Sequence, residues 1–142
     1  MENEPMNVPE VLVNLVDVFV IMRRYNVNGR IQRVAGELVE TAGMEKKMVL
    51  LSSLWSYDFA TSKFQESAVS SVYRDRLAQV SGRSPKDIID EIKVRANLIK
   101  ILLERDIKDF KDVTAFCRKY AANPFATIAE LGLKREDLLH TV

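Results

Sequence analysis

The sequence predicts an α+β fold, in which a small antiparallel or mixed sheet built on a hairpin precedes a helical lobe. Segments rich in β-branched and aromatic residues lie between residues 18 and 64, and such segments favour strands. The pair Asn28-Gly29 predicts a hairpin turn, because both central positions of a type I′ turn need positive φ. After residue 66, apolar residues recur every three or four positions, which indicates amphipathic helices.

The first expected elements are a short helix and a hairpin. Pro9 begins a helix over residues 9–15, because its fixed φ suits the first helical position. Residues 18–25 are expected as a strand whose first half is apolar on both faces, as in a strand covered on two sides. Residues 30–41 form the partner strand, and Gly36 within them indicates a bulge.

Further strands are expected before the helices. Gly43 predicts a turn, and residues 48–54 follow it as a third strand. An aromatic stretch then alternates with polar residues and predicts two short strands. Its members are Trp55, Tyr57, Phe59 and Phe64. Such rings can stack on a base or a nucleotide, but near a domain boundary we favour packing.

The helical part has well-marked ends. Gly82 is expected to end one helix in the left-handed conformation. Ser84, Pro85 and Asp87 predict a shortened capping box at the start of a helix over residues 85–105. The apolar stripe expected on that helix consists of Ile88, Ile92, Ile99, Leu102 and Leu103.

Asp109 predicts the N-cap of the next helix, and Pro124 stops or restarts it. The residues expected to face inward are Phe110, Val113, Phe116, Cys117 and Tyr120. Because Cys117 falls on this apolar stripe, a packed and inert thiol is expected. Residues 125–131 and 134–139 are expected as a last helical pair. We place two parts at residues 1–65 and 66–142.

Composition and motifs indicate no catalytic centre. The 142 residues carry a net charge of +1 and a single cysteine, which excludes an internal disulfide. No phosphate-binding loop motif is present, and His140 is the only histidine. No catalytic, cofactor-binding or metal-binding residue is therefore predicted. Asp90 and Glu91 are adjacent on a helix, point in different directions and are interpreted as solvated surface charges.

Four arginines flank the predicted hairpin turn: Arg23, Arg24, Arg30 and Arg33. Their guanidinium groups suit phosphates or the carboxylates of a neighbouring subunit. From the residues alone, a solvated strand end is the favoured interpretation.

The order of these motifs resembles the archaeal type II/type IV secretion and archaellum motor ATPases. The similar segments, in order, are "PMNVP" (5–9), "DVFVIMRRYNVNGRIQRV" (17–34), "LWSYDF" (54–59), Gly82-Arg83-Ser84, the form E-I-x-x-R at Glu91, Ile92 and Arg95, and "DIKDFKDVTAFCRKYAANP" (106–124). The resemblance covers residues 5 to about 131. The most specific segments are 5–9 and 106–124, and the order of all the segments adds weight.

The resemblance implies that residues 1–65 are the β-rich end of a RecA-like motor core and that residues 66–142 are its C-terminal helical lobe. In that family, the motifs that hold ATP and Mg lie before this segment, and none is present here. The chain alone is therefore expected to hold no cofactor and to be inactive as an ATPase. The arginine cluster becomes the expected contact between subunits.

The resemblance further implies three partners: the remainder of the ATPase, neighbouring subunits of a hexamer, and an integral-membrane platform protein. It places the chain in the cytoplasm, at the inner face of the membrane, with no nucleic acid. Secretion, pilus and archaellum roles stay open. An adaptor or a helix-turn-helix-like nucleic-acid-binding module is the alternative, because the helices at 85–105 and 109–121 are joined by a short turn.

Overall fold

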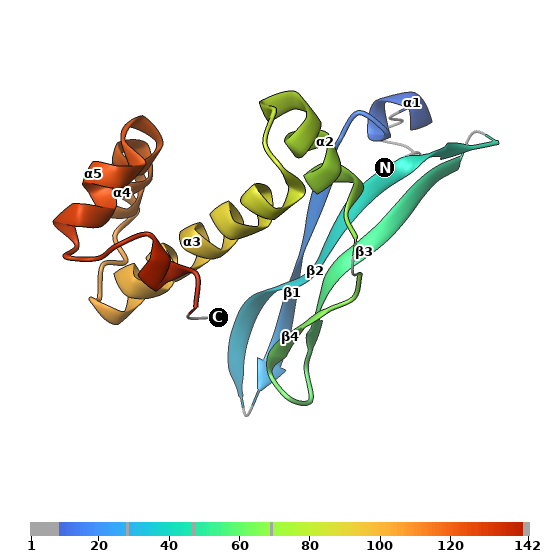
Figure 1. Cartoon of the computed structure of the whole chain (residues 1–142). Coiled ribbons are helices and arrows are strands. Elements are labelled where there is room, and N and C mark those ends of the chain that lie inside the picture. Colours follow the sequence, from blue (N-terminus) through green and yellow to red (C-terminus); the bar gives the residue numbers. More distant parts are fainter. Residues whose placement is uncertain (1–8, 28, 47, 69, 141–142) are drawn as a thin grey trace. The chain divides into compact units, whose positions relative to one another are not determined.

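The computed structural model of the chain describes residues 9–27, 29–46, 48–68 and 70–140 (Figure 1). Its residues form two compact units, Met1–Val80 and Ser81–Val142. The "PMNVP" segment, apart from Pro9, and Asn28 of the expected turn lie outside the described residues. None of the described helices has the length and apolar character needed to cross a membrane.

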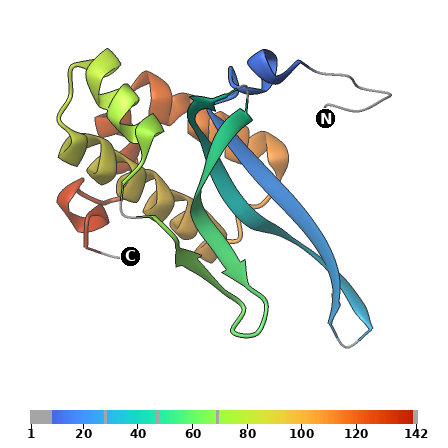
Figure 2. The same cartoon turned by 90° about the vertical axis from the view of Figure 1, so that its right-hand side faces the viewer.

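The first unit is an antiparallel sheet with two helices. It contains α1 (Glu10–Val13), β1 (Val18–Val27), β2 (Arg30–Glu45), β3 (Met48–Asp58), β4 (Lys63–Glu66) and nearly all of α2 (Val72–Ser81). The strands form a meander in the order β1-β2-β3-β4 (Figure 2). The second unit contains α3 (Pro85–Glu104), α4 (Phe110–Ala122), α5 (Pro124–Glu130) and the 3-10 helix η1 (Glu136–Leu138). The predicted α+β class, with the sheet first and the helices after it, is confirmed.

Two glycines of β2 differ in their roles. Between the pairs Ile21–Glu37 and Met22–Ala35, Gly36 is the extra residue, so the predicted bulge is confirmed. A Cβ at Gly36 would lie 2.3 Å from Cγ of Arg23. The turn predicted at Gly43 is wrong, because β2 continues to Glu45 and Gly43 pairs with Leu50 beside a second bulge.

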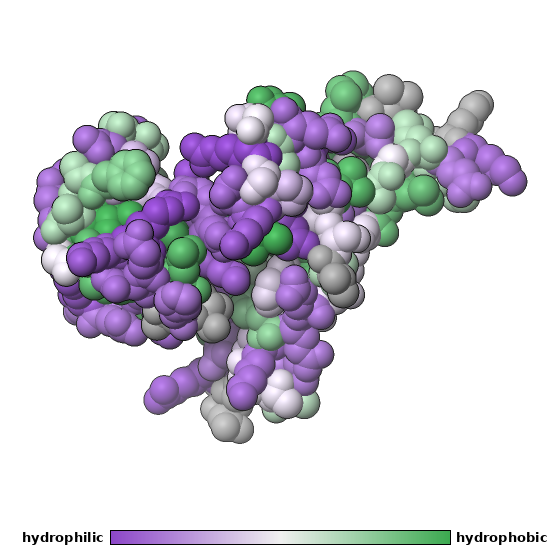
Figure 3. All heavy atoms as spheres, viewed as in Figure 1, coloured by the Kyte–Doolittle hydropathy of each residue, from purple (hydrophilic) through white to green (hydrophobic). Residues whose placement is uncertain are grey.

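The strand predictions are otherwise correct in position but not in extent. The aromatic stretch does not begin a new strand at Trp55, because β3 runs without interruption to Asp58 before β4 follows. The prediction that β1 is covered on both sides is wrong. Val20 and Met22 are 58% and 63% exposed, and β1 is an edge strand of the described sheet. Apolar side chains also reach the surface near α1 and the neighbouring part of the sheet (Figure 3).

A buried carboxylate joins the sheet to helix α2. Glu40 is only 1% exposed. One of its oxygens accepts hydrogen bonds from Ser71 Oγ at 2.6 Å and the Tyr73 N–H at 3.1 Å, and the other accepts from the Val72 N–H at 2.9 Å. Burial favours its protonated form, but these hydrogen bonds outweigh burial and hold the pKa of Glu40 below its ordinary value. Glu40, which lies on strand β2, thus caps the first turn of helix α2.

The predicted capping of α3 is confirmed. Ser84 Oγ accepts from the Asp87 N–H, and the Asp87 carboxylate accepts from the Ser84 N–H, both at 3.1 Å. Gly82, at φ +66°, supplies the left-handed residue before it. The apolar stripe predicted for α3 is only partly correct. Ile88 and Leu102 are buried, whereas the other three members, Ile92, Ile99 and Leu103, are exposed.

The buried face of α3 is instead formed by Val94, Asn97 and Leu98 with Ile88 and Leu102. Val94 and Leu98 belong to a core cluster with Tyr120, Ile128 and Leu138. Asn97 donates a hydrogen bond from Nδ2 to the Leu138 carbonyl at 2.7 Å. This bond fixes the segment that follows α5 against α3 and satisfies the buried amide.

The predicted start of α4 is confirmed, since the Asp109 carboxylate accepts from the Lys111 N–H at 2.8 Å. Tyr120 is buried as expected, but Phe110 is 82% exposed. Cys117 is also exposed, so the prediction of a packed thiol is wrong. Pro124 begins α5 as predicted, and the last expected helix is reduced to η1.

Candidate functional site

The helical unit contains a polar cleft of about 420 Å³, which lies between residues of α3, the end of α4, the start of α5 and the segment before η1. Its polar lining residues are Arg83, Asp87, Glu91, Arg95, Tyr120 and Arg135. This volume lies within the range of ligand sites, which is about 300–1,000 Å³.

Glu91 is the centre of the cleft. Its carboxylate accepts hydrogen bonds from Arg95 Nε, Tyr120 Oη and Arg135 Nη1, each at 2.9 Å. The Glu91 side chain is 15% exposed. Burial favours its protonated form, but the three hydrogen bonds and the charge of Arg135 outweigh burial and lower the pKa of Glu91. The interpretation of Glu91 as a solvated surface charge is therefore wrong.

Tyr120 and Arg135 hold the charge of Glu91 in place. Burial, together with the bond to Glu91, raises the pKa of Tyr120. Burial lowers the pKa of Arg135, but Glu91 more than compensates, so the net shift is upward. Proton transfer at neutral pH needs a group with a pKa near neutrality. Because the pKa values of Glu91 and Tyr120 are both shifted away from neutrality, the arrangement suits binding better than acid–base catalysis.

The three cations of the cleft differ in how they are engaged. Arg95 lies over the ring of Tyr120, with Cζ 5.5 Å from the ring centroid, a cation–π geometry. Its side chain is 63% exposed, whereas that of Arg135 is 28% exposed. Arg83 acts on Asp87 through its charge and helps lower the pKa of that carboxyl, after the hydrogen bonds from Ser84.

The four arginines predicted as a site lie on the β1–β2 hairpin. Arg24 pairs directly with Arg33 across the strands, while Arg30 pairs with Val27. Since side chains alternate between the faces of a strand, Arg23 and Arg30 lie on one face, and Arg24 and Arg33 on the other. All four are exposed. Within the described residues, none of the four guanidinium groups has an ion pair.

Aromatic residues of β3, of β4 and of the connection between them pack on one another. Tyr57 meets Phe59 and Phe64 edge-on, with ring centroids 5.2 and 5.1 Å apart. Tyr25 of β1 joins them at 4.9 Å from Phe59, which the sequence pattern did not predict. For these residues the packing interpretation is confirmed. Trp55 makes no ring contact with them in the described part of the chain and is 40% exposed.

Sequence reasoning missed the cleft. The E-I-x-x-R pattern placed Glu91 and Arg95 one helical turn apart, which was the only local signal for it. Tyr120 and Arg135 are 29 and 44 residues away from Glu91. Among the residues that the structure describes, no three His, Cys, Asp or Glu side chains are grouped so that they could hold a metal ion.

No protein-family model and no curated protein matches the chain. The resemblance to the motor ATPases therefore depends on the motifs and their order.

Proposed function

We propose that the chain is the C-terminal part of a hexameric secretion or archaellum motor ATPase. In this role it packs against neighbouring subunits and relays ATP-driven motion to an integral-membrane platform protein at the inner face of the membrane. The order of motifs from residue 5 to about 131 supports the family. The geometric observation that carries the proposal is the edge strand β1 together with the exposed apolar side chains of the sheet unit.

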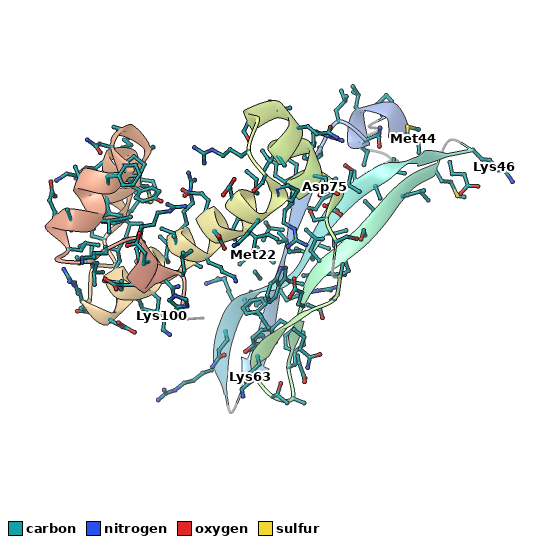
Figure 4. All side chains as sticks on the ribbon, in the orientation of Figure 1. Met22, Met44, Lys46, Lys63, Asp75 and Lys100 are labelled. Carbon is teal, nitrogen blue, oxygen red and sulfur yellow. The ribbon has the colours of Figure 1, made fainter. Side chains whose placement is uncertain are left out.

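Five large apolar side chains on the described strands are more than half exposed. They are Val20, Met22, Ile31, Met48 and Leu51, of which Met22 is labelled in Figure 4. Val20 and Met22 stand on one face of the edge strand β1, whereas Leu51, which pairs with Thr41, stands on the other face of the sheet. Exposed apolar side chains on both faces fit protein–protein contacts. The edge strand β1, ten residues long, adds a row of backbone groups suited to further pairing. A sheet of this kind fits a part that is covered by the rest of a motor core.

The hairpin arginines support a contact between subunits. Like charges directly opposite each other in a sheet destabilise it, and Arg24 lies directly opposite Arg33. Carboxylates of a neighbouring subunit would neutralise both guanidinium groups. In the helical unit, α3 has 20 residues and a length of about 30 Å, so it supplies a stiff element for rigid-body motion.

The first test is the coding sequence upstream of Met1. The proposal expects a phosphate-binding loop encoded there, in the same frame or in a neighbouring gene, and a region without one would contradict it. The second test combines the chain with that nucleotide-binding segment. We expect binding, assembly and ATP turnover by the complex, and no turnover by the chain alone.

In that complex, the double variant Arg24→Glu/Arg33→Glu should weaken assembly at least about tenfold, because two charge contacts are lost. The matched control is Lys111→Glu/Arg118→Glu on α4, which should leave assembly unchanged. Equal assembly of both variants would contradict the proposed contact through the hairpin arginines. Steeply salt-dependent DNA binding would favour the nucleic-acid alternative. Against that alternative, Lys119 of α4 is already paired with Glu130.

A further inference from the structure

We infer that the cleft around Glu91 binds an acidic peptide segment of a partner protein, in which a carboxylate side chain stands next to an apolar one. This goes beyond the proposed function and depends only on residues of the helical unit. Three properties of the cleft carry it: an excess of hydrogen-bond donors, a net positive charge, and an apolar wall beside the charges.

The donors of the cleft outnumber its free acceptors. A guanidinium group has five N–H donors. Arg95 and Arg135 each use one on Glu91, and the guanidinium of Arg83 has no hydrogen-bond partner among the described residues. Glu91, by contrast, accepts three hydrogen bonds, and Oδ2 of Asp87 accepts from the N–H and Oγ of Ser84. An entering carboxylate would supply the missing acceptors.

The charge of the cleft selects the type of anion. Three arginines and two carboxylates line it, which leaves one net positive charge. A single carboxylate matches this charge. A phosphate dianion would bring a second negative charge close to Glu91 and Asp87, where like charges repel. The cleft therefore favours a carboxylate over a phosphate.

An apolar wall lies beside the guanidinium groups. It consists of Ala121, Pro124 and Phe125. Phe125 is 74% exposed, although it stands on the capped first turn of α5, where Asn123 Oδ1 accepts from the Ala126 N–H at 3.1 Å. A peptide with an apolar residue next to its carboxylate would cover this ring, and a free ion would not.

The cleft is already arranged for binding. Glu91 links α3 to α4 through Tyr120, and to the segment before η1 through Arg135. These bonds hold Arg95 and Arg135 in position before a ligand arrives, which reduces the entropy lost on binding. Glu91 is thus a positioning residue for the two guanidinium groups.

The test is an NMR titration of the full ¹⁵N-labelled chain with the capped pentapeptide Gly-Leu-Glu-Leu-Gly. Its matched control is the same peptide with Gln in place of Glu. We expect saturable shifts at the amides of Arg83, Arg95, Phe125 and Arg135, with a Kd of ~1 mM or below. The Gln peptide should bind about tenfold more weakly, because charge-assisted hydrogen bonds are lost. A third titration uses inorganic phosphate.

The variant Arg83→Gln removes a donor that is not part of the Glu91 network, so the fold should be kept. It should weaken binding of the Glu peptide at least about fivefold, since a charge-assisted contact is lost. Arg118→Gln, on the exposed surface of α4, should not change it. The proposal is overturned by the absence of saturable shifts, by equal binding of the Gln peptide, by an unaffected Arg83→Gln variant, or by tighter binding of phosphate than of the Glu peptide.

Discussion

Glu40 of the sheet unit and Glu91 of the helical unit are both largely withdrawn from solvent, but they are satisfied by different donors. Glu40 receives a hydroxyl and two backbone N–H groups, all neutral. Glu91 receives two guanidinium groups and a phenol. Each neutral donor to Glu40 has a single N–H or O–H group, so none remains for a ligand. A guanidinium group that binds Glu91 keeps further N–H donors free. The first arrangement is a cap, and the second is suited to become a site.

The largest effect is expected from removing each carboxylate. Glu40→Ala leaves three donors without an acceptor, of which Ser71 is buried and the two backbone N–H groups are partly buried, and should lower the free energy of unfolding by about 3 kcal/mol. Glu91→Ala should cost about 1–2 kcal/mol, because the freed guanidinium groups can reach water. Native-state amide hydrogen exchange measures both, unit by unit. The control Glu37→Ala should stay within about 0.5 kcal/mol. Equal losses for Glu40→Ala and Glu91→Ala would break the comparison.

A pH titration should give the next largest effect. The folded-state pKa is lowered for both Glu40 and Glu91. Each carboxylate therefore contributes stability that is present above its unfolded pKa and is lost as pH falls through its folded pKa. We expect the stability of both units to be flat near neutrality and to decrease below the ordinary glutamate pKa of 4.5.

The isosteric variants Glu40→Gln and Glu91→Gln should each flatten this acid limb, but only in the unit that carries the change. Denaturant unfolding followed by amide exchange at several pH values measures this. An acid limb that persists in both variants would assign the pH dependence to other carboxyl groups.

The smallest effects compare single donors. Ser71→Ala removes the hydroxyl that donates to Glu40 and accepts from the Arg74 N–H. It should cost about 1.5 kcal/mol, because two backbone N–H groups remain as hydrogen-bond donors to Glu40. Tyr120→Phe removes one donor from Glu91 but keeps the ring beneath Arg95, and should cost about 1 kcal/mol. Tyr73→Phe is the matched control and should change the free energy of unfolding by less than about 0.5 kcal/mol. A larger loss for Tyr120→Phe than for Ser71→Ala would contradict the comparison.

Local signals predicted the ends of the helices well. The capping box of Ser84 and Asp87, the left-handed Gly82, the N-cap Asp109 and the restart at Pro124 were all found from the sequence. Each of these depends on bonds or backbone angles within about four residues, so the information is contiguous in the chain. The bulge at Gly36 was also predicted, because a glycine inside a strand weakens it and often marks a bulge.

Gly43 marks the limit of this reasoning. A glycine with positive φ suits a turn or a bulge equally well, and only the pairing with Leu50 decided for a bulge. The buried face of α3 was decided in the same way. Ile92, Ile99 and Leu103 have the spacing of a core stripe, yet the packing of α4, α5 and η1 buries Val94, Asn97 and Leu98 instead.

The sequence by itself determined the order of strands and helices, the caps that separate them and the absence of a phosphate-binding loop. Tertiary structure decided which carboxylates are buried and which arginines share a face. It brought Tyr120 and Arg135 to Glu91 across 29 and 44 residues. The physical reason is that propensity and capping act within a turn or two, whereas burial and charge pairing depend on neighbours that only the folded chain supplies.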